Sequence, residues 1–255
     1  GDVRPAMGKG RDLILALLKE NFGTDGGLSD KAIFLNKIPG EDRSDEVIAH
    51  GEVIAVVRFE VELNRFSLEL RQAGAELLKD MATTNVVVFG NMSGHLKGKS
   101  VPGANIREIK GEFEEGAPLL LIKGGKVGPG TAYVSSKEMR DAEKAFRIKD
   151  LNSLTNMPLS PDSDRKRFIS ANLAHLRSIE SSAASDIRSF IKDKKQPVTS
   201  SFSGGKDSLA ALGVLMKVKK DPELLFVDTG LEFPETVAYV DDFVKRHRLR
   251  LHRAE

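Results

Sequence analysis

The chain has 255 residues, no cysteine and a formal net charge of +2, with 30% charged and 40% hydrophobic residues. This composition is typical of a globular protein of about two domains, and it excludes disulfides, cysteine-held zinc or iron–sulfur clusters and a thiol nucleophile within these residues. No apolar run approaches the roughly 20 residues of a membrane span, and nothing before Lys9 resembles a signal peptide, so we expect a cytoplasmic location and no membrane partner.

Residues 1–80 are predicted to form a small α+β domain. A helix over 10–22 places Leu13, Leu17 and Leu18 on one face. The pattern then changes to the alternation of half-buried antiparallel strands. Four strands and a closing helix are expected, in the order 33–38, 46–49, 53–60, 66–70 and 72–81. No chemistry stands out in this part of the chain.

Residues 81–150 are predicted to be all β and to form a small closed barrel, because short strands alternate with glycine turns. Gly124-Gly125 predicts a two-residue hairpin turn, and ordinary strand pairing should break at Gly128-Pro129-Gly130. Ser135 and Glu138 have capping-box spacing, which predicts a short helix. The expected strands are 85–89, 104–109, 118–123, 126–134 and 145–148.

Residues 151–163 are rich in Pro, Ser and Asn, which favours a linker. Residues 164–255 begin with a long helix to about 194 and then alternate strand and helix, which predicts an open parallel sheet. The expected elements are strand 198–202, helix 209–220, strand 224–227, helix 235–247 and a strand starting at 249. A domain with an open parallel sheet needs more residues than these, so we expect an incomplete domain in a segment of a longer protein. The expected fold class of the chain is multidomain, α/β and α+β.

The candidate site is the loop Ser203–Ser208, which joins a predicted strand to a helix. Gly204 and Gly205 let the backbone approach a phosphate closely, and the amides at the start of the helix form a concave site for anions. Lys206 adds a mobile positive charge, and the two serines add hydroxyl donors. Asp207 would repel a phosphate unless it orients the loop or holds Mg²⁺, so a metal-bound polyphosphate is the expected ligand.

Asp228 ends the neighbouring strand at the edge of the sheet where such folds bind ligands. Asp207 and Asp228 are therefore candidates for Mg²⁺ or ribose contacts. Lys206 and Asp207 are the candidate catalytic residues, because Lys206 and the glycine amides can stabilise charge that develops on phosphates. The expected nucleotide-binding residues are Ser203, Gly204, Gly205, Lys206, Asp207, Ser208, Asp228, Thr229, Gly230, Glu235 and Thr236.

The loop does not have Walker A spacing. Ser203-Gly204-Gly205-Lys206-Asp207-Ser208 resembles the PP-loop, S-G-G-x-D-S, of the ATP pyrophosphatase superfamily. With Val227-Asp228-Thr229-Gly230 and Phe233-Pro234-Glu235-Thr236, it resembles the phosphoadenosine phosphosulfate (PAPS) reductase / ATP sulfurylase branch. The resemblance covers about 165–255. It implies binding of ATP or an adenylyl sulfate nucleotide for chemistry at the α-phosphate, in sulfur metabolism or RNA modification.

The type of reaction is left open between adenylyl transfer and reduction. The intact loop favours ATP, because the resemblance implies that PAPS reductases, whose substrate has no pyrophosphate, usually carry an altered loop. Those reductases also use a cysteine near the C-terminus, and this chain has none. A reductase therefore remains the alternative only if a cysteine outside this segment completes the site.

A second resemblance concerns residues 81–150. Val101-Pro102-Gly103 and the stretches 115–122 and 127–136 resemble a PUA domain, with Gly116-Ala117 where the family has Gly-Asp. The resemblance implies RNA contact, and an upstream PUA-like domain is typical of archaeal proteins related to PAPS reductase. Candidate phosphate contacts are Lys97, Lys99, Arg107, Lys110, Lys123 and Lys126. A non-catalytic RNA-binding protein is a further alternative, and the sequence leaves the oligomeric state open.

Overall fold

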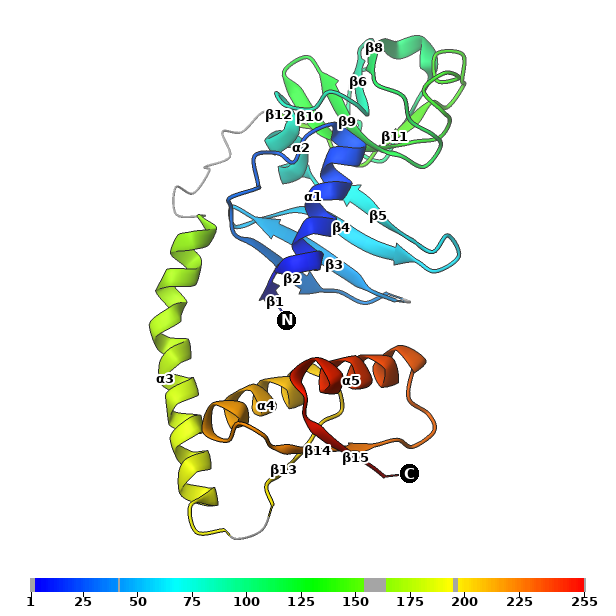
Figure 1. Ribbon diagram of the computed structural model, residues 1–255. Helices are drawn as coiled ribbons and strands as arrows, with labels where there is room; N and C mark the ends of the chain where they lie inside the picture. Colours follow the sequence, from blue (N-terminus) through cyan, green and yellow to red (C-terminus); the bar gives the residue numbers. More distant parts are fainter. Residues whose placement is uncertain (1–2, 41, 154–163, 195–196, 255) are drawn as a thin grey trace. The chain divides into compact units, whose positions relative to one another are not determined.

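A computed structural model of the chain describes residues 3–40, 42–153, 164–194 and 197–254 (Figure 1). Most of the predicted linker, residues 151–163, lies outside the described residues. The chain divides into two compact units, Gly1–Ile169 and Ser170–Glu255. The expected class is confirmed, because the first unit contains an antiparallel and a curled mixed sheet and the second a parallel sheet. The predicted boundary at residue 80 stays a prediction.

The first unit begins with a five-stranded antiparallel sheet in the order β1-β2-β3-β4-β5. Its elements are β1 (Val3–Pro5), α1 (Gly8–Phe22), β2 (Ile33–Lys37), β3 (Ser44–Ala49), β4 (Glu52–Glu60), β5 (Arg65–Leu70) and α2 (Gln72–Leu78). Helix α1 crosses one face of this sheet (Figure 1) and packs Ile14, Leu18 and Phe22 into its core. The sheet and both helices therefore form the predicted α+β arrangement, with β1 as an additional strand.

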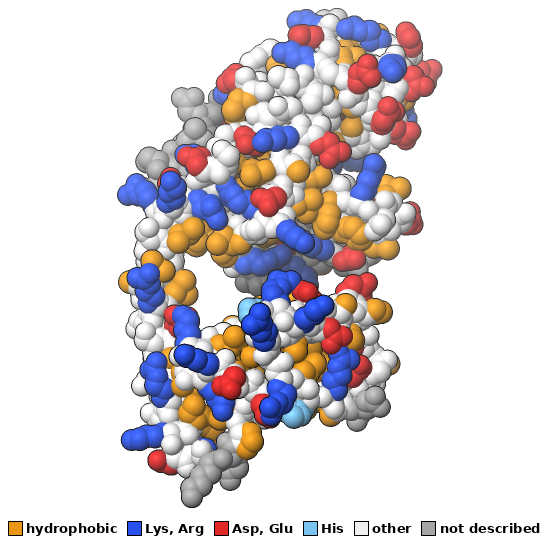
Figure 2. Space-filling view, in the orientation of Figure 1, with side chains coloured by type: hydrophobic (Ala, Val, Ile, Leu, Met, Phe, Trp, Pro, Cys, Tyr) orange, Lys and Arg blue, Asp and Glu red, His pale blue; other side chains and the backbone are white. Residues whose placement is uncertain are grey.

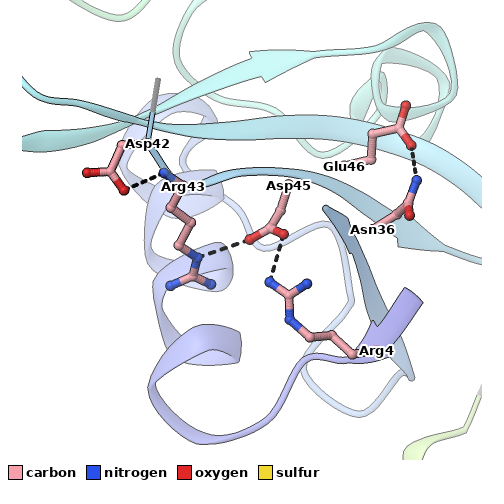
Figure 3. Close-up of polar contacts among 6 residues, drawn as sticks. All are labelled: Arg4, Asn36, Asp42, Arg43, Asp45 and Glu46. Carbon is pink, nitrogen blue, oxygen red and sulfur yellow. Dashed lines mark hydrogen bonds and ion pairs between the residues drawn. The ribbon is translucent and has the colours of Figure 1, made fainter. Parts of the chain in front are cut away.

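A buried carboxylate on the central strand β3 holds two arginines of this sheet (Figure 3). The side chain of Asp45 is only 2% exposed, and its two oxygens accept bonds from Arg4 Nη2 at 2.7 Å and Arg43 Nε at 3.0 Å. On the neighbouring register position, Asn36 Nδ2 donates to Glu46 Oε2 at 2.8 Å. A buried charge is costly without such partners. The two arginines therefore account for the buried aspartate at the start of β3.

The second part of this unit is a seven-stranded sheet that curls around its own core. Its elements are β6 (Val86–Phe89), β7 (Ser100–Val101), β8 (Ile106–Lys110), β9 (Pro118–Lys123), β10 (Lys126–Ala132), β11 (Phe146–Ile148) and β12 (Asn152–Ser153). The order is β7-β11-β10-β9-β6-β8, and β12 pairs with β10. Phe89 and Phe146 fill the interior with rings 5.3 Å apart. Among the described pairs none joins β7 to β8, so the sheet is a half-barrel rather than the closed barrel expected.

The break expected at Gly128-Pro129-Gly130 occurs on only one side of β10. Pairing with β9 continues through all three residues. On the other side, β12 pairs with Lys126–Val127 and β11 with Gly130–Ala132, and nothing pairs at Pro129 in these two ladders. Proline has no N–H to donate, so its free side must face the interrupted edge. Strand pairing is therefore interrupted at Gly128-Pro129-Gly130 on the side of β11 and β12, as expected from the proline, and it continues on the side of β9.

The helix expected after Ser135 does not form. Ser135 Oγ donates to Glu138 Oε2 at 2.7 Å, a side-chain bond rather than the side-chain-to-backbone bonds of a capping box, and residues 136–141 make consecutive turns. The N–H of Gly103 donates to Ala142 O at 2.8 Å, and Met139 is fully buried. The backbone of Met139 and Arg140 also packs closely on Gly103, where a Cβ would lie 2.3 Å and 2.2 Å from their carbonyl oxygens, so the segment is held as turns against this residue.

The second unit is built on three parallel strands in the order β13-β14-β15. Its elements are α3 (Arg165–Ile191, which starts in the first unit), β13 (Thr199–Ser201), α4 (Lys206–Val218), β14 (Glu223–Val227), α5 (Pro234–His247) and β15 (Arg250–Ala254). Helices α4 and α5 lie on one face of the sheet (Figure 1). Phe202, Leu212, Leu224, Phe226 and Val240 form the core between them.

Helix α3 keeps much of its apolar surface in contact with solvent (Figure 2). Leu176, Ile179 and Phe190 are 58%, 54% and 72% exposed, whereas Ala184 is buried. Its described link to α4 is the ion pair between Glu180 and Lys217. Within the described residues, α3 is the longest helix, and neither it nor any other combines the length and the hydrophobicity of a membrane span.

Candidate nucleotide-binding site

The loop Ser203–Ser208 begins at the carboxyl edge of the parallel sheet. β13 pairs with β14 through Ser201 and Leu225, and the N–H of Phe202 continues the ladder to Leu225 O at 2.8 Å. The Phe202 ring is fully buried in the core beneath α4 and α5. The chain is therefore held rigidly up to the residue before the loop. α4 then begins at Lys206, with Gly205 as its N-cap.

Hydrogen bonds within the loop close it into a tight turn. Gly204 has a φ of +75°, a conformation that favours glycine. Ser208 Oγ donates to Gly205 O at 3.0 Å and lies 3.2 Å from Ser203 Oγ. The N–H of Gly205 points toward Ser203 Oγ at 3.4 Å. The two predicted serines thus lie side by side and brace the turn.

Lys206 and Asp207 are exposed in the first turn of α4. Neither makes a hydrogen bond or ion pair with another residue in the part of the chain that the structure describes. The free amides of the first turn carry partial positive charge, which an anion can neutralise. The ammonium group of Lys206 is therefore free to join these amides around an anion at the loop.

Helix α5 lies against the turn at Gly204. A Cβ atom on Gly204 would lie 3.3 Å from Tyr239 Cδ1, 3.3 Å from Val240 Cγ2 and 3.7 Å from Thr236 Cγ2. Thr236 was among the predicted site residues, and Tyr239 and Val240 were not. Their spacing on the predicted helix, three and four residues after Thr236, places all three on one helix face, and that is the signal that could have found them.

The segment Asp228–Thr236 follows β14 at the same edge of the sheet as the loop. The N–H of Asp228 donates to Ala254 O at 2.8 Å, and the N–H of Gly230 donates to Asp228 Oδ1 at 3.0 Å. One carboxylate oxygen of Asp228 thus closes a turn, and the other accepts no hydrogen bond within the part of the chain that the structure describes. Thr229, Gly230 and Glu235 are exposed. Sequence and structure therefore agree that both loops follow adjacent parallel strands.

The structure does not assemble the two aspartates into a multi-ligand metal centre. Among the described residues, no group of three or more His, Cys, Asp or Glu side chains could hold a metal ion. Asp207 belongs to the first turn of α4 and Asp228 to the turn after β14. A metal at this edge would therefore have to take most of its ligands from a phosphate and from water.

The carboxyl group of Glu223, which lies away from the loop, has a shifted pKa. Glu223, at the amino end of β14, accepts bonds from His252 Nε2 at 2.9 Å and Arg250 Nη1 at 2.7 Å. The bond from His252, with the charge of Arg250, outweighs the effect of burial and lowers the pKa of the Glu223 carboxyl. This cluster ties β15 to β14 at the edge opposite the site.

Residues 197–255 match the phosphoadenosine phosphosulfate reductase domain family. The C-terminal part of the chain is related to this family. The chain is also 39% identical over 83 residues to the sulfate adenylyltransferase subunit 2 of Mycolicibacterium vanbaalenii. This match covers 31% of this chain and 26% of that protein. The predicted resemblance to the PAPS reductase / ATP sulfurylase branch is thereby confirmed.

Over its whole length the chain is similar to two uncharacterized proteins of Methanocaldococcus jannaschii. One is 32% identical over 273 residues, covering 99% of this chain and 56% of that protein, and the other is 29% identical, covering 94% and 54%. The chain thus spans about half the length of these relatives. A PUA domain protein of Thermoplasma acidophilum is similar in structure, with a TM-score of 0.41 and 13% identity over 58% of this chain and 91% of that chain.

Proposed function

We propose that this chain binds ATP or a related adenylyl nucleotide at Ser203–Ser208, as part of an enzyme that acts on the α-phosphate by adenylyl transfer. The observation that carries this proposal is the loop itself, a left-handed glycine turn at the carboxyl edge of a parallel sheet that leads directly into α4. The relationship of residues 197–255 to a nucleotide-using family supports it.

In this proposal the residues of the loop have separate tasks. The amides of the first turn of α4 hold the phosphate oxygens, because they point out of the helix and have no partner within it, and the Gly205 amide, which makes only a long bond of 3.4 Å to Ser203 Oγ, joins them. Lys206, which has no ion pair among the described residues, neutralises charge that builds up as the α–β bond breaks. Ser203 and Ser208 keep the turn closed around the ligand.

Mg²⁺ enters this proposal with the nucleotide. Asp207 and the free oxygen of Asp228 would supply carboxylate ligands, and phosphate oxygens and water would complete the set. When bound, the metal would neutralise phosphate charge. The residues fit this use, because Mg²⁺ commonly takes only one or two carboxylates from the protein. Thr229, Gly230, Glu235 and Thr236 are proposed to line the rest of the nucleotide.

Adenylyl transfer is preferred to reduction for two reasons. The sulfate adenylyltransferase subunit that resembles this segment is named for transfer of an adenylyl group. The chain itself has no cysteine that could act as a reductant. A role in sulfur metabolism or in RNA modification follows as part of the proposal, and the acceptor of the adenylyl group is left open.

RNA contact by residues 81–150 is a separate proposal. Lys97 is paired with Asp150 at 3.2 Å, and the Arg107 guanidinium lies against Gly90. Lys99, Lys110 and Lys126 are exposed and are therefore the better phosphate contacts of the predicted set. RNA affinity of this kind should fall with salt and should survive Lys206→Ala. An affinity that is lost with Lys206→Ala would place the RNA at the nucleotide site instead.

The test of the main proposal is calorimetric titration of the chain with ATP and Mg²⁺. Lys206→Ala should weaken binding at least about tenfold, because one charge-assisted contact of this kind contributes more than 1 kcal/mol. Lys217→Ala is the matched control on the same helix, since Lys217 is held by Glu180 at the other end of α4. Absence of ATP binding, or equal losses in both variants, would contradict the proposal. Release of pyrophosphate with labelled product from α-labelled ATP then tests the reaction.

A further inference from the structure

One side chain of α5 contacts both ends of the turn that the phosphate loop makes. The Phe202 ring, which precedes the loop, lies 6.5 Å from the Tyr239 ring and 4.9 Å from the Phe243 ring between centroids. A Cβ on Gly204, inside the loop, would lie 3.3 Å from Tyr239 Cδ1, so the ring, which is 40% exposed, leaves room there only for glycine. Tyr239 therefore joins a fully buried anchor to the exposed turn that follows it.

The hydrogen bonds that close the loop leave Gly204 itself without a hydrogen-bond partner among those described. They link Ser203, Gly205 and Ser208 to one another, and none of them reaches Gly204. Two consecutive glycines have more backbone freedom than any other pair of residues. Tyr239 and Val240 lie close to Gly204 and therefore restrict the turn in addition to the hydrogen bonds on either side of this residue.

We propose that Tyr239 is a positioning residue of the phosphate loop, which acts through Gly204 and does not touch the nucleotide. This inference rests on the proposed nucleotide binding. Its ring keeps the Gly204–Lys206 amides in the orientation that an anion needs. The nucleotide then does not have to order the loop when it binds, and its affinity is higher for that reason. Because α5 starts directly after the segment Asp228–Phe233, the same helix holds the second loop of the site.

The test compares Tyr239→Ala with Tyr239→Phe in this chain. Tyr239→Ala should weaken binding of ATP with Mg²⁺ about tenfold, since the turn must then be ordered by the ligand. It should also speed hydrogen exchange of the Gly204–Lys206 amides without ligand. Tyr239→Phe keeps the ring and should restore both values to those of the unmodified chain.

Val244→Ala is the matched control, because Val244 packs on the same core one turn further along α5. It should lower the melting temperature and leave ATP affinity and loop exchange unchanged. Equal affinity in Tyr239→Ala and the unmodified chain would overturn the inference, as would an equal loss in Val244→Ala. If the unmodified chain binds no ATP, the proposed function fails, and the exchange rates still decide whether Tyr239 holds the turn.

Discussion

Single glycines allow two segments of the backbone to approach closely, and single charged residues bind several partners of opposite charge. Gly204 sits in a left-handed conformation against α5, and Gly128 lies where a Cβ would be 2.0 Å from Asp150 O. Glu69 gathers three cations, Arg58 at 2.8 Å, Arg71 at 3.0 Å and Lys149 at 3.1 Å. The glycine at the loop was predictable from the sequence, whereas the cations around Glu69 include Lys149, which lies about 80 residues further along the chain.

Gly204→Ala should reduce both stability and ATP affinity. An L-residue in the left-handed region costs about 1–2 kcal/mol, and the new Cβ would also press on Tyr239 and Val240. Urea unfolding and ATP titration measure the two effects. Gly116→Ala is the control, since Gly116 has a φ of +81° and no atom within 4 Å of its Cβ position. Gly116→Ala should lose only the stability that the left-handed backbone conformation costs. Unchanged ATP affinity in Gly204→Ala would contradict the assignment of the loop as the nucleotide site.

Glu69 should make the first unit sensitive to acid. Burial acts to raise the pKa of its carboxyl, but hydrogen bonds from Arg58 and Lys149 and the charges of Lys149 and Arg71 outweigh it and lower the pKa. A lowered carboxyl pKa stabilises the fold above the ordinary value of about 4.3, and this contribution is lost as pH falls through the folded pKa.

Unfolding free energies of the chain and of Glu69→Gln, measured from pH 7 to pH 3, test this effect. The variant should be less stable at pH 7, by about 1–3 kcal/mol for a lost charged hydrogen bond, and the two curves should converge in acid. Curves that stay parallel at all pH values would show that Glu69 does not carry the sensitivity.

Elements were predictable from the sequence where they are long and amphipathic. Most strands and helices of both units lie within a few residues of their expected positions, including the strand, loop and helix around the site. The failures are short segments. β1, β7 and β12 have two or three residues each, which is too short for a hydrophobic period to show. The segment after Ser135 makes turns in place of the expected helix, and the Ser135 hydroxyl bonds to the Glu138 carboxylate.

Helix α2 shows how packing overrides the preference of one residue. A Cβ on Gly74 would lie 2.1 Å from Ile54 O and 2.7 Å from Leu70 Cδ1. Gly74→Ala should therefore destabilise the first unit, because the clash with β4 exceeds the roughly 1 kcal/mol gained in helix propensity. Gly213→Ala, in α4 with no atom within 4 Å, should gain about 0.5–1 kcal/mol instead. Thermal melts compare the two, and a stabilised Gly74→Ala would refute the close approach.

At the scale of the whole molecule, the first unit is one folding entity in spite of its two sheets. Val86, Leu120 and Val127 of the curled sheet belong to the same hydrophobic cluster as Phe22, Leu70 and Leu78. Gln72 Nε2 of α2 also donates to Val127 O of β10 at 2.9 Å. The predicted α+β and β-barrel regions thus share a core, which their sequence patterns alone do not show.

Leu120→Ala should therefore weaken both sheets of this unit together. Leu120 is fully buried, and its truncation should cost about 2–5 kcal/mol. In native-state hydrogen exchange, amides of β4 and of β10 should lose equal protection. The amides of β14, in the second unit, serve as the internal control and should keep theirs. Unchanged protection in β4 would show that the two sheets unfold independently.

By itself the sequence determined the class of each region, the strand–loop–helix order around Ser203–Ser208 and the family of residues 197–255. These are local properties, because periodicity, glycines and motif spacing act between near neighbours in the chain. Only the tertiary structure decided that the barrel is a curled half-barrel, that the two sheets share one core and that Tyr239 packs on Gly204. Those outcomes depend on which segments far apart in the sequence pack together. That packing is determined by the shape and burial of side chains, and local sequence patterns do not encode it.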